Sequence, residues 1–288
     1  MPGSRGQLLS PALRLWLLLF YLAYTLLPIV WLFLGTIYTQ SGLLTAPMPI
    51  APTQLTWRNY VDVFTPAAFG ETHGQSTFVL AFRNSVLVSL GATGLAMLFG
   101  TPAAYAFVRF NVPRKRALLF AVLGCQLLPA ISLIVPLFRL LRGAGLLDTL
   151  LGLILAYSTF SLPFVVWIMA GYFQRIPEAL EEAARMDGAS RWQAFWYVAL
   201  PLAAPGLAVT ALCTLLNAWD EFFFALIFTS TYASKTLPVA LAEFIGRHSV
   251  NWGLLVTGGL LASLPPIVLS LVFYRAVVSG LTTGGLKG

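Results

Sequence analysis

The residues that could carry chemistry in this chain interrupt an apolar stretch towards its C-terminal end: Asn217, Trp219, Asp220 and Glu221. Acidic side chains at membrane depth are costly, and they usually face the interior of a helix bundle or water. One interpretation is that these residues line a path for a polar solute. A second is that a neighbouring helix or a partner subunit holds them for packing and register. A third is that Asp220 and Glu221 carry protons or cations, which would make the chain a secondary transporter driven by an ion gradient.

The sequence offers little other catalytic chemistry. It has no Gly-x-x-x-x-Gly-Lys-Ser/Thr motif for the phosphates of ATP, no Ser/His/Asp set and no metal-binding spacing. Cys125 and Cys213 lie in apolar runs, where cysteine behaves as a small buried hydrophobe. The net charge is +7, but the basic residues lie in short segments beside apolar runs, which argues against nucleic acid as a partner. The sequence predicts a protein that is not an enzyme by itself and binds no metal or cofactor.

A charged, amphipathic segment, Pro177–Pro201, contrasts with the apolar remainder and predicts two short helices joined by a turn. Pro177 suits the first position of the first helix, where its missing N–H costs nothing. Gly188 suits the position just past the end of that helix. The dipole of the helix favours the acidic residues near its start, which are Glu178, Glu181 and Glu182.

The second of these helices has its own start and stop signals. Ser190 suits an N-cap and Gln193 completes a capping box, whereas Pro201 ends the helix or kinks its junction with the next apolar run. Ala183 and Ala184 on the first helix allow close approach of a partner, and a short amphipathic helix in a groove is a common mode of recognition. The alternative is a pair of helices lying on lipid headgroups.

The rest of the chain is typical of an integral membrane protein. Of its 288 residues, 58% are hydrophobic and 9% are charged, and the mean hydropathy is +0.83. Crossing a bilayer takes about 20 apolar residues. Six runs reach that length, and we expect an all-α membrane protein with six transmembrane helices: Leu15–Ile37, Ser85–Val108, Ala117–Phe138, Leu150–Phe173, Leu202–Phe228 and Gly253–Val278. Pro129 and Pro136 predict a kink in the third run.

The basic residues predict the orientation. If the N-terminus is cytoplasmic, the cytoplasmic segments hold eleven Lys and Arg residues and the external segments hold six. The positive-inside rule therefore places both termini and the 174–201 segment in the cytoplasm, and the basic loop from Arg109 to Arg116 is explained as a topology anchor. The expected organisation is a cytoplasmic N-terminus (1–14), a six-helix domain (15–280) and a flexible cytoplasmic tail (281–288).

The longest external segment, 38–84, is predicted to be irregular, with one short helix near Trp57–Phe64. Its prolines include Pro47, Pro49 and Pro52. It could contact an external binding protein or simply cap the helix ends, and the sequence favours neither.

The charged segment resembles a family motif. ABC-importer permeases carry E-A-A, three residues, G, nine residues and I-x-L-P, and this chain has Glu182-Ala183-Ala184, then Gly188, then Val198-Ala199-Leu200-Pro201. The spacing matches throughout, and the departure is Val198 in place of isoleucine. Further stretches are similar to the smaller permease subunit of maltose-type carbohydrate importers, including Trp57-Arg58-Asn59-Tyr60, Gly145-Leu146-Leu147-Asp148-Thr149 and Trp219-Asp220-Glu221-Phe222. The fifth apolar run, Leu202–Phe228, departs from that family in having Asp220 before Glu221, where a less acidic pair is expected.

The resemblance implies a multi-pass permease of a bacterial or archaeal inner membrane that imports a sugar or oligosaccharide. Its implied partners are a second homologous permease subunit, an ATPase dimer that binds ATP and Mg²⁺, an external solute-binding protein and membrane lipid. The implied ATPase-coupling residues are Glu182, Ala183, Ala184, Asp187 and Gly188, and the C-terminal residues Gly284–Gly288 are implied to contact the ATPase as well. Besides the secondary transporter, the competing hypothesis is a structural membrane subunit without a transport path.

Overall fold

The computed structural model describes residues 10–45, 52–65, 77–245 and 250–285, and it divides the chain into two units. The first unit combines Met1–Ser76 with Leu241–Leu261, and the second combines Thr77–Ala240 with Ala262–Gly288. Within the described ranges the regular structure is helical, apart from two isolated bridges that join Tyr38 to Leu55 and Ile245 to Val250. The predicted all-α class is confirmed.

Four helices are long and apolar enough to cross a bilayer: α1 (Pro11–Thr36), α4 (Thr77–Arg109), α7 (Leu150–Arg175) and α14 (Trp252–Gly285). Two bent pairs of helices meet the same criterion, so the described residues hold up to six spans. The 33 residues of α4 correspond to about 50 Å of helix, which exceeds the roughly 30 Å hydrocarbon core of a bilayer. Because α4 begins at Thr77 instead of Ser85, the predicted external loop is shorter than expected.

The third predicted span is not one continuous helix. It consists of α5 (Lys115–Leu127), the 3-10 turn η3 (Ala130–Leu133) and α6 (Ile134–Gly143), with a bend of 94° at the break. The predicted kink is confirmed at Pro129, because the residue before a proline is driven out of the helical region and Leu128 has an extended ψ of 126°. Pro136 lies in the first turn of α6, where its missing N–H has no helical partner to lose.

The fifth predicted span, Leu202–Phe228, is also wrong as a single helix. The chain turns by 76° at Ala203, between α10 (Leu200–Leu202) and α11 (Ala204–Trp219), and α12 (Phe223–Phe228) is separate. Asp220 and Glu221 lie at the break between α11 and α12, but the apolar residues on both sides outweigh them in a hydropathy average, so hydropathy alone could not reveal that α11 stops at Trp219.

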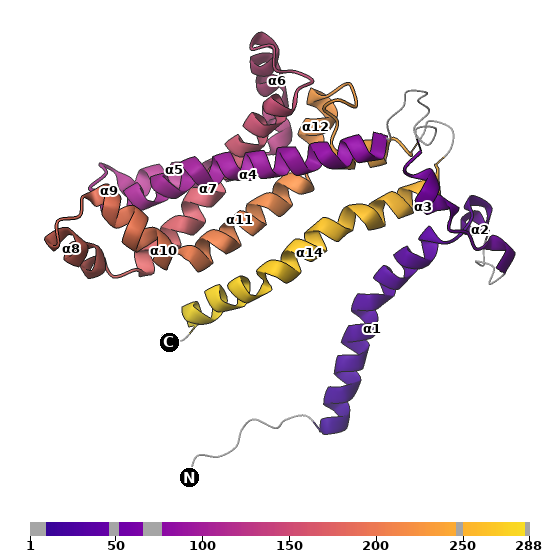
Figure 1. The fold of residues 1–288 in the computed structure, drawn as a ribbon, viewed down its shortest axis with the longest axis horizontal. Coiled ribbons are helices and arrows are strands. Elements are labelled where there is room, and N and C mark those ends of the chain that lie inside the picture. Colours follow the sequence, from indigo (N-terminus) through magenta and orange to yellow (C-terminus); the bar gives the residue numbers. More distant parts are fainter. Residues whose placement is uncertain (1–9, 46–51, 66–76, 246–249, 286–288) are drawn as a thin grey trace. The chain divides into compact units, whose positions relative to one another are not determined.

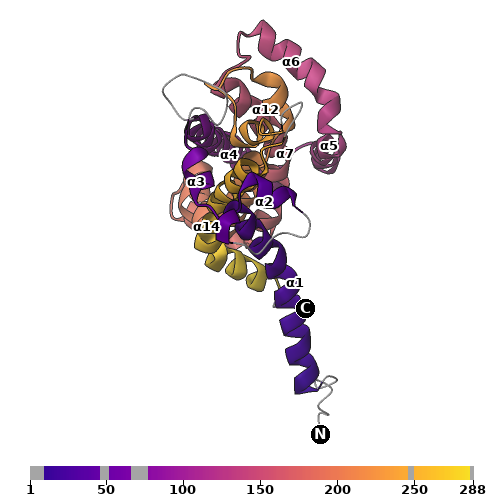
Figure 2. The ribbon, with the colours of Figure 1, turned by 90° about the vertical axis from the view of Figure 1, so that its right-hand side faces the viewer.

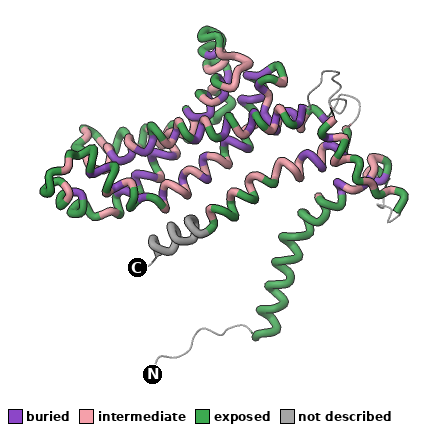
Figure 3. The backbone as a smooth tube through the Cα atoms, in the orientation of Figure 1, coloured by how far each residue is buried: buried purple, intermediate pink, exposed green. Residues whose placement is uncertain are grey.

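In the second unit, α4, α7 and α11 pack side by side and form the core (Figures 1 and 2). Their buried residues lie mainly on facing sides, whereas α1 of the first unit exposes apolar side chains along most of its length (Figure 3). One cluster of buried side chains holds Val88, Ala92, Leu153, Tyr157, Ala218, Phe224 and Phe228. A second cluster, towards Arg109, holds Ala96, Ala104, Tyr105, Val165, Met169, Phe173, Phe195 and Ala199.

Small residues set the spacing between α4 and α7, as is common for helices in lipid. A Cβ on Gly100 would lie 2.7 Å from Val165 Cγ1, whereas a Cβ on Gly94 of the same helix would meet nothing within 4 Å. We expect Gly100→Ala to lower the free energy of unfolding by about 1–3 kcal/mol through overpacking. Gly94→Ala should raise it by up to about 1 kcal/mol through helix propensity. Unfolding of both variants in detergent checks this prediction. Equal stabilities of the two variants would contradict the close contact between Gly100 and Val165.

The first unit contains three short elements after α1: α2 (Gln40–Leu44), the 3-10 turn η1 (Pro52–Gln54) and α3 (Arg58–Asp62). The short helix predicted near Trp57–Phe64 is confirmed as α3. Asn59 Nδ2 donates to the carbonyl oxygens of Thr36 and Tyr38, both at 2.8 Å, and so ties α3 to the end of α1. Pro47 and Pro49 of the predicted loop lie outside the described residues.

Asp148 joins the α6–α7 turn to the chain that follows α12. Its N–H donates to Phe228 O at 2.8 Å, and its backbone has a positive φ of 57°. Its carboxylate accepts from the N–H groups of Ser230 (2.8 Å) and Thr231 (3.0 Å), and from the hydroxyls of Thr231 (2.8 Å) and Ser234. A single carboxylate therefore holds two distant turns of the second unit together.

These contacts predict a pH dependence. Partial burial raises the pKa of Asp148, but the hydrogen bonds outweigh it and lower the pKa from 3.8 to about 2. Because the folded pKa is the lower one, the stabilisation is complete well above pH 4 and is lost as the pH falls towards 2. Allowing for solvent screening, we expect Asp148→Asn to be about 1–2 kcal/mol less stable than the wild type at pH 6, with a difference that shrinks between pH 4 and pH 2. Unfolding in detergent across this range checks it, and a difference independent of pH would contradict it.

The C-terminal helix is longer than predicted. α14 runs to Gly285, so Gly284 and Gly285 end a helix instead of forming a flexible tail. Near its start, Gln40 Nε2 donates to Val250 O at 2.7 Å within the first unit. The remaining predicted tail residues, 286–288, lie outside the described residues, as do Arg5, Arg247 and His248.

Candidate functional site

The charged segment forms α8 (Glu178–Met186), whose ends are fixed by local sequence. Pro177 is the N-cap and not the first helical residue, so that prediction was off by one position. At the other end the N–H of Gly188 bonds Arg185 O at 3.1 Å and the N–H of Ala189 bonds Ala184 O at 3.0 Å, which is the Schellman pattern. Gly188 has a φ of +94°, a conformation that disfavours any Cβ, and its predicted role in ending the helix is confirmed.

The second predicted helix begins as expected and then deviates. Ser190 and Gln193 form the capping box at the start of α9 (Arg191–Ala194), with bonds of 3.2 and 2.8 Å. The chain continues as a π-helical turn, η4 (Phe195–Ala199), and then α10. Pro201 lies in α10, shortly before the 76° bend, so its predicted effect at the junction is confirmed.

The predicted coupling residues lie together on α8 and its C-terminal turn. Four of the five are exposed and Ala184 is half-buried: Glu182, Ala183, Ala184, Asp187 and Gly188. Two apolar side chains on the same helix are also exposed, Leu180 at 47% and Met186 at 88%. An exposed surface of small, apolar and acidic residues on a short helix can bind in a groove of another protein.

The residue that attaches α8 to the rest of the second unit is Glu181, and sequence reasoning missed it. Glu181 is the buried residue of α8, with 4% exposure. Its Oε1 accepts from Arg109 Nε at 2.7 Å and its Oε2 accepts from the Tyr105 hydroxyl at 2.5 Å. The Arg109 NH2 group also donates to Ile176 O, at 2.7 Å, in the link between α7 and α8. Arg109 therefore has a structural partner beyond its predicted role in topology.

Sequence signals for this contact are weak. The glutamate pair Glu181-Glu182 gives no indication which member is buried, and Arg109 precedes Glu181 by 72 positions. One sequence signal could have indicated this contact: Arg109 ends an apolar span, and an acidic helix follows later in the chain. A buried carboxylate needs a cationic or hydrogen-bonding partner, and such an arginine can supply it.

The second group of predicted residues is divided by the end of α11. Asn217 and Glu221 line a hollow, whereas Asp220 is exposed and is not among the lining residues. Trp219 is buried: its Nε1 donates to Ala262 O at 3.2 Å, and its ring meets Phe82 edge to face. Two of the four predicted positions therefore line the hollow and two do not, since adjacent residues at a helix end point in different directions; their role in a translocation path stays a prediction.

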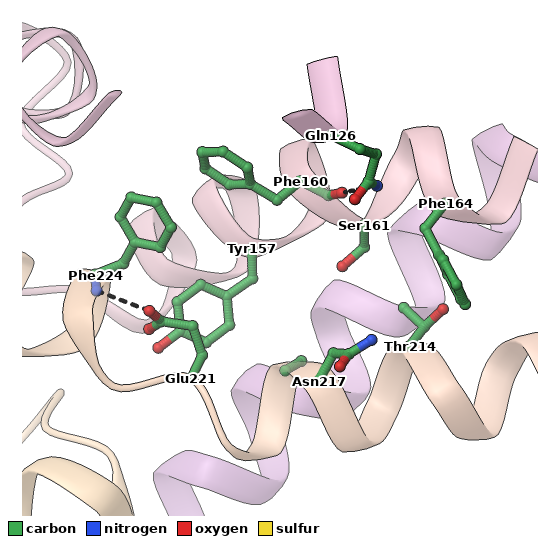
Figure 4. Close-up of a pocket in the computed structure, with 10 residues that line it drawn as sticks. Gln126, Tyr157, Phe160, Ser161, Phe164, Thr214, Asn217, Glu221 and Phe224 are labelled. Carbon is green, nitrogen blue, oxygen red and sulfur yellow. Dashed lines mark hydrogen bonds between the residues drawn. The ribbon is translucent and has the colours of Figure 1, made fainter. Parts of the chain in front are cut away.

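The hollow has a volume of about 270 Å³ and lies between α5, α7 and the end of α11 (Figure 4). Its lining combines aromatic rings with amides, hydroxyls and one carboxylate: Gln126, Tyr157, Phe160, Ser161, Phe164, Thr214, Asn217, Ala218, Glu221 and Phe224. Gln126 is fixed by a bond of 3.1 Å from its Nε2 to Phe160 O. Such a surface can stack against the apolar face of a polar solute and exchange hydrogen bonds with its hydroxyl groups.

Glu221 has a second role at this hollow. Its carboxylate accepts from the N–H groups of Phe224 (2.9 Å) and Ala225 (3.2 Å), which lie in the first turn of α12. Negative charge at a helix start is stabilised by the exposed N–H groups and the dipole. Figure 4 shows this bond to Phe224, and Tyr157 beside the carboxylate. Within the described ranges no three metal-binding side chains lie close enough together to hold an ion.

Comparisons with known proteins agree with these features. Residues 96–283 match the family model described as "Binding-protein-dependent transport system inner membrane component". The chain is 39% identical over 267 residues to the trehalose transport system permease protein SugB of Mycobacterium tuberculosis, covering 92% of this chain and 93% of the relative. It is 33% identical over 264 residues to the trehalose/maltose transport system permease protein MalG of Thermococcus litoralis, covering 91% and 92% of the two chains.

Solved structures support the fold. A chain of a bacterial ABC transporter that imports the acidic polysaccharide alginate aligns with a TM-score of 0.77 at 22% identity, covering 96% of this chain and 99% of that one. A chain of the MetNI methionine ABC transporter aligns with a TM-score of 0.58 at 21% identity, covering 70% and 95%. The residues that match the family model, 96–283, include α8 and the residues that line the hollow. The chain therefore belongs to the family of binding-protein-dependent transport system inner-membrane components.

Proposed function

We propose that this chain is a transmembrane permease subunit of an ABC importer and that α8 is its contact with the ATPase. The observation that carries the proposal is the Glu182-Ala183-Ala184…Gly188 pattern, which forms an exposed helix closed by a glycine turn. Glu182 and Asp187 supply polar contacts to the ATPase, Ala183 and Ala184 allow close approach, and Gly188 permits the turn. ATP binding brings the two ATPase subunits together, and this movement pulls on α8. The helix bundle then changes from an inward-facing to an outward-facing state.

The proposed substrate is a sugar or oligosaccharide. Relatives are named for trehalose, for trehalose and maltose and, at 35% identity in Agrobacterium fabrum, for sulfoquinovosyl glycerol. The hollow offers the groups that a sugar needs, because Phe160 and Phe164 are apolar rings and Asn217 and Gln126 are amides. Asn217 and Glu221 are the proposed contacts of this subunit with the translocation path.

The proposed assembly contains a second homologous permease subunit, two ATPase subunits that bind ATP and Mg²⁺, and an external solute-binding protein. Both termini and α8 face the cytoplasm of a bacterial or archaeal cell, and the segment around α3 faces outward. The distribution of basic residues supports this orientation.

The alternative of an ion-driven secondary transporter gains no support from the acidic pair. Both carboxylate oxygens of Glu221 accept backbone N–H groups of α12, so this carboxylate has a structural role at the start of that helix. Asp220 lies outside the lining of the hollow.

The test is uptake of labelled trehalose or maltose into vesicles that hold the whole transporter, with binding protein outside and ATP inside. We expect uptake that needs ATP and the ATPase and that survives an ionophore. Uptake driven by an ion gradient without the ATPase would overturn the proposal and return attention to Asp220 and Glu221.

A further inference from the structure

The attachment of α8 to the membrane-embedded helices differs from ordinary helix packing. Apart from Glu181, the residues of α8 are exposed or half-buried. Helices of globular proteins are usually held by an apolar stripe, and the hydrophobic effect that holds it has no preferred direction. Here the buried contact is a carboxylate, and hydrogen bonds to a carboxylate have defined directions and short lengths.

The partners of Glu181 connect it to several elements at once. Arg109 ends α4 and bonds both Glu181 in α8 and Ile176 in the preceding link. The side chains of Arg109 and Glu181 are 9% and 6% exposed, so solvent screens their attraction weakly. One guanidinium therefore fixes the start of α8 against the end of α4.

Tyr105 extends this contact into the apolar core. It lies one turn before Arg109 on α4, and its hydroxyl donates to Glu181 at 2.5 Å. Its ring packs against Phe173 of α7 and Phe195 of η4, with centroid distances of 5.5 and 4.7 Å. The carboxylate is thus connected through Tyr105 to the helices before and after α8.

We propose that Tyr105, Glu181 and Arg109 form a rigid joint that makes α8 move as one body with the end of α4, so that displacement of α8 reaches the transmembrane core. The inference rests on the proposed function of α8 as the ATPase contact. Glu181 is then a positioning residue. Without the Glu181 carboxylate, less of the movement of α8 reaches α4. The exposed docking surface, which includes Glu182 and Ala183, is unchanged.

The first test measures coupling in the complete reconstituted transporter, with Glu181→Gln and Tyr105→Phe compared with the wild type. We expect the ATPase to co-purify as before and ATP hydrolysis to continue, while sugar uptake per ATP falls on the order of tenfold, within the range typical of coupling between two sites. Arg142→Gln, an exposed charge removed from the other end of the second unit, is the control and should leave the ratio unchanged.

If Glu181→Gln leaves sugar uptake per ATP unchanged, the proposal is overturned. It is also overturned if Glu181→Gln loses both uptake and the bound ATPase, because that result would assign Glu181 to docking or folding. Failure of the proposed function has a different signature: an Ala183→Arg variant would then keep both its ATPase and its uptake.

A second measurement does not depend on transport. Spin labels at Met186→Cys on α8 and Phe99→Cys on α4, both exposed sites, report the distance between the two helices once Cys125 and Cys213 are replaced by serine. We expect a narrow distance distribution that Glu181→Gln broadens. A distribution of equal width in both proteins would overturn the rigid joint.

Discussion

Replacing Arg109 with leucine is expected to lower the free energy of unfolding by about 3–5 kcal/mol, because it leaves the buried Glu181 carboxylate without its cation. The remaining Tyr105 hydroxyl compensates for one oxygen only, and Ile176 O loses its donor as well. Chemical or thermal unfolding of the purified chain in detergent measures the loss.

The double variant Arg109→Leu/Glu181→Leu is expected to recover much of that stability, since apolar replacement of both members of a buried pair is often close to neutral. The exposed pair of Arg58 and Asp62, at 3.4 Å, provides the matched control. Arg58→Leu should change stability by less than about 1 kcal/mol, because exposed ion pairs contribute little. A similar loss in Arg58→Leu and Arg109→Leu, or a double variant as unstable as the single one, would contradict this account.

Replacing Ala183 with arginine is expected to weaken association with the ATPase by roughly 30-fold, the effect of losing about 2 kcal/mol at the centre of an interface. Ala183 is exposed on α8, so the longer side chain should leave the fold and its stability intact while it prevents close approach. Co-purification of the ATPase and ATP-driven uptake should fall together.

Ala144→Arg is the matched control, because Ala144 is an exposed alanine at the end of α6 and belongs to no proposed contact. It should retain the ATPase and the uptake of the wild type. Retention of the ATPase by Ala183→Arg at wild-type levels would contradict the assignment of α8 as the docking helix.

Features encoded by neighbouring residues could be predicted from the sequence. The turn at Gly188 and the capping box of Ser190 and Gln193 depend on a few consecutive positions, so their chemistry is visible in the chain. The membrane spans follow from composition, which hydropathy detects over about 20 residues. Their interruptions do not follow from hydropathy averaged over that length, because apolar residues on both sides outweigh the acidic pair Asp220-Glu221 that follows Trp219.

Features that depend on distant residues could not be predicted in the same way. The burial of Glu181 is decided by Arg109 and Tyr105 on another helix, and nothing local distinguishes it from Glu182. Likewise, Asn217 and Glu221 line the hollow while Asp220 does not, because the backbone leaves the helical path between them. The role of the coupling residues stays a prediction.

The long separation between Arg109 and Glu181 has a consequence for biosynthesis. A ribosome adds about 5–20 residues per second, so the 72 positions between them take roughly 4–14 s to make. During that interval α4 can enter the bilayer, but its terminal guanidinium has no carboxylate and has to remain among headgroups or water. The pair closes only after α7 has been inserted and α8 has left the ribosome, so its formation marks the moment at which this part of the newly made chain is complete.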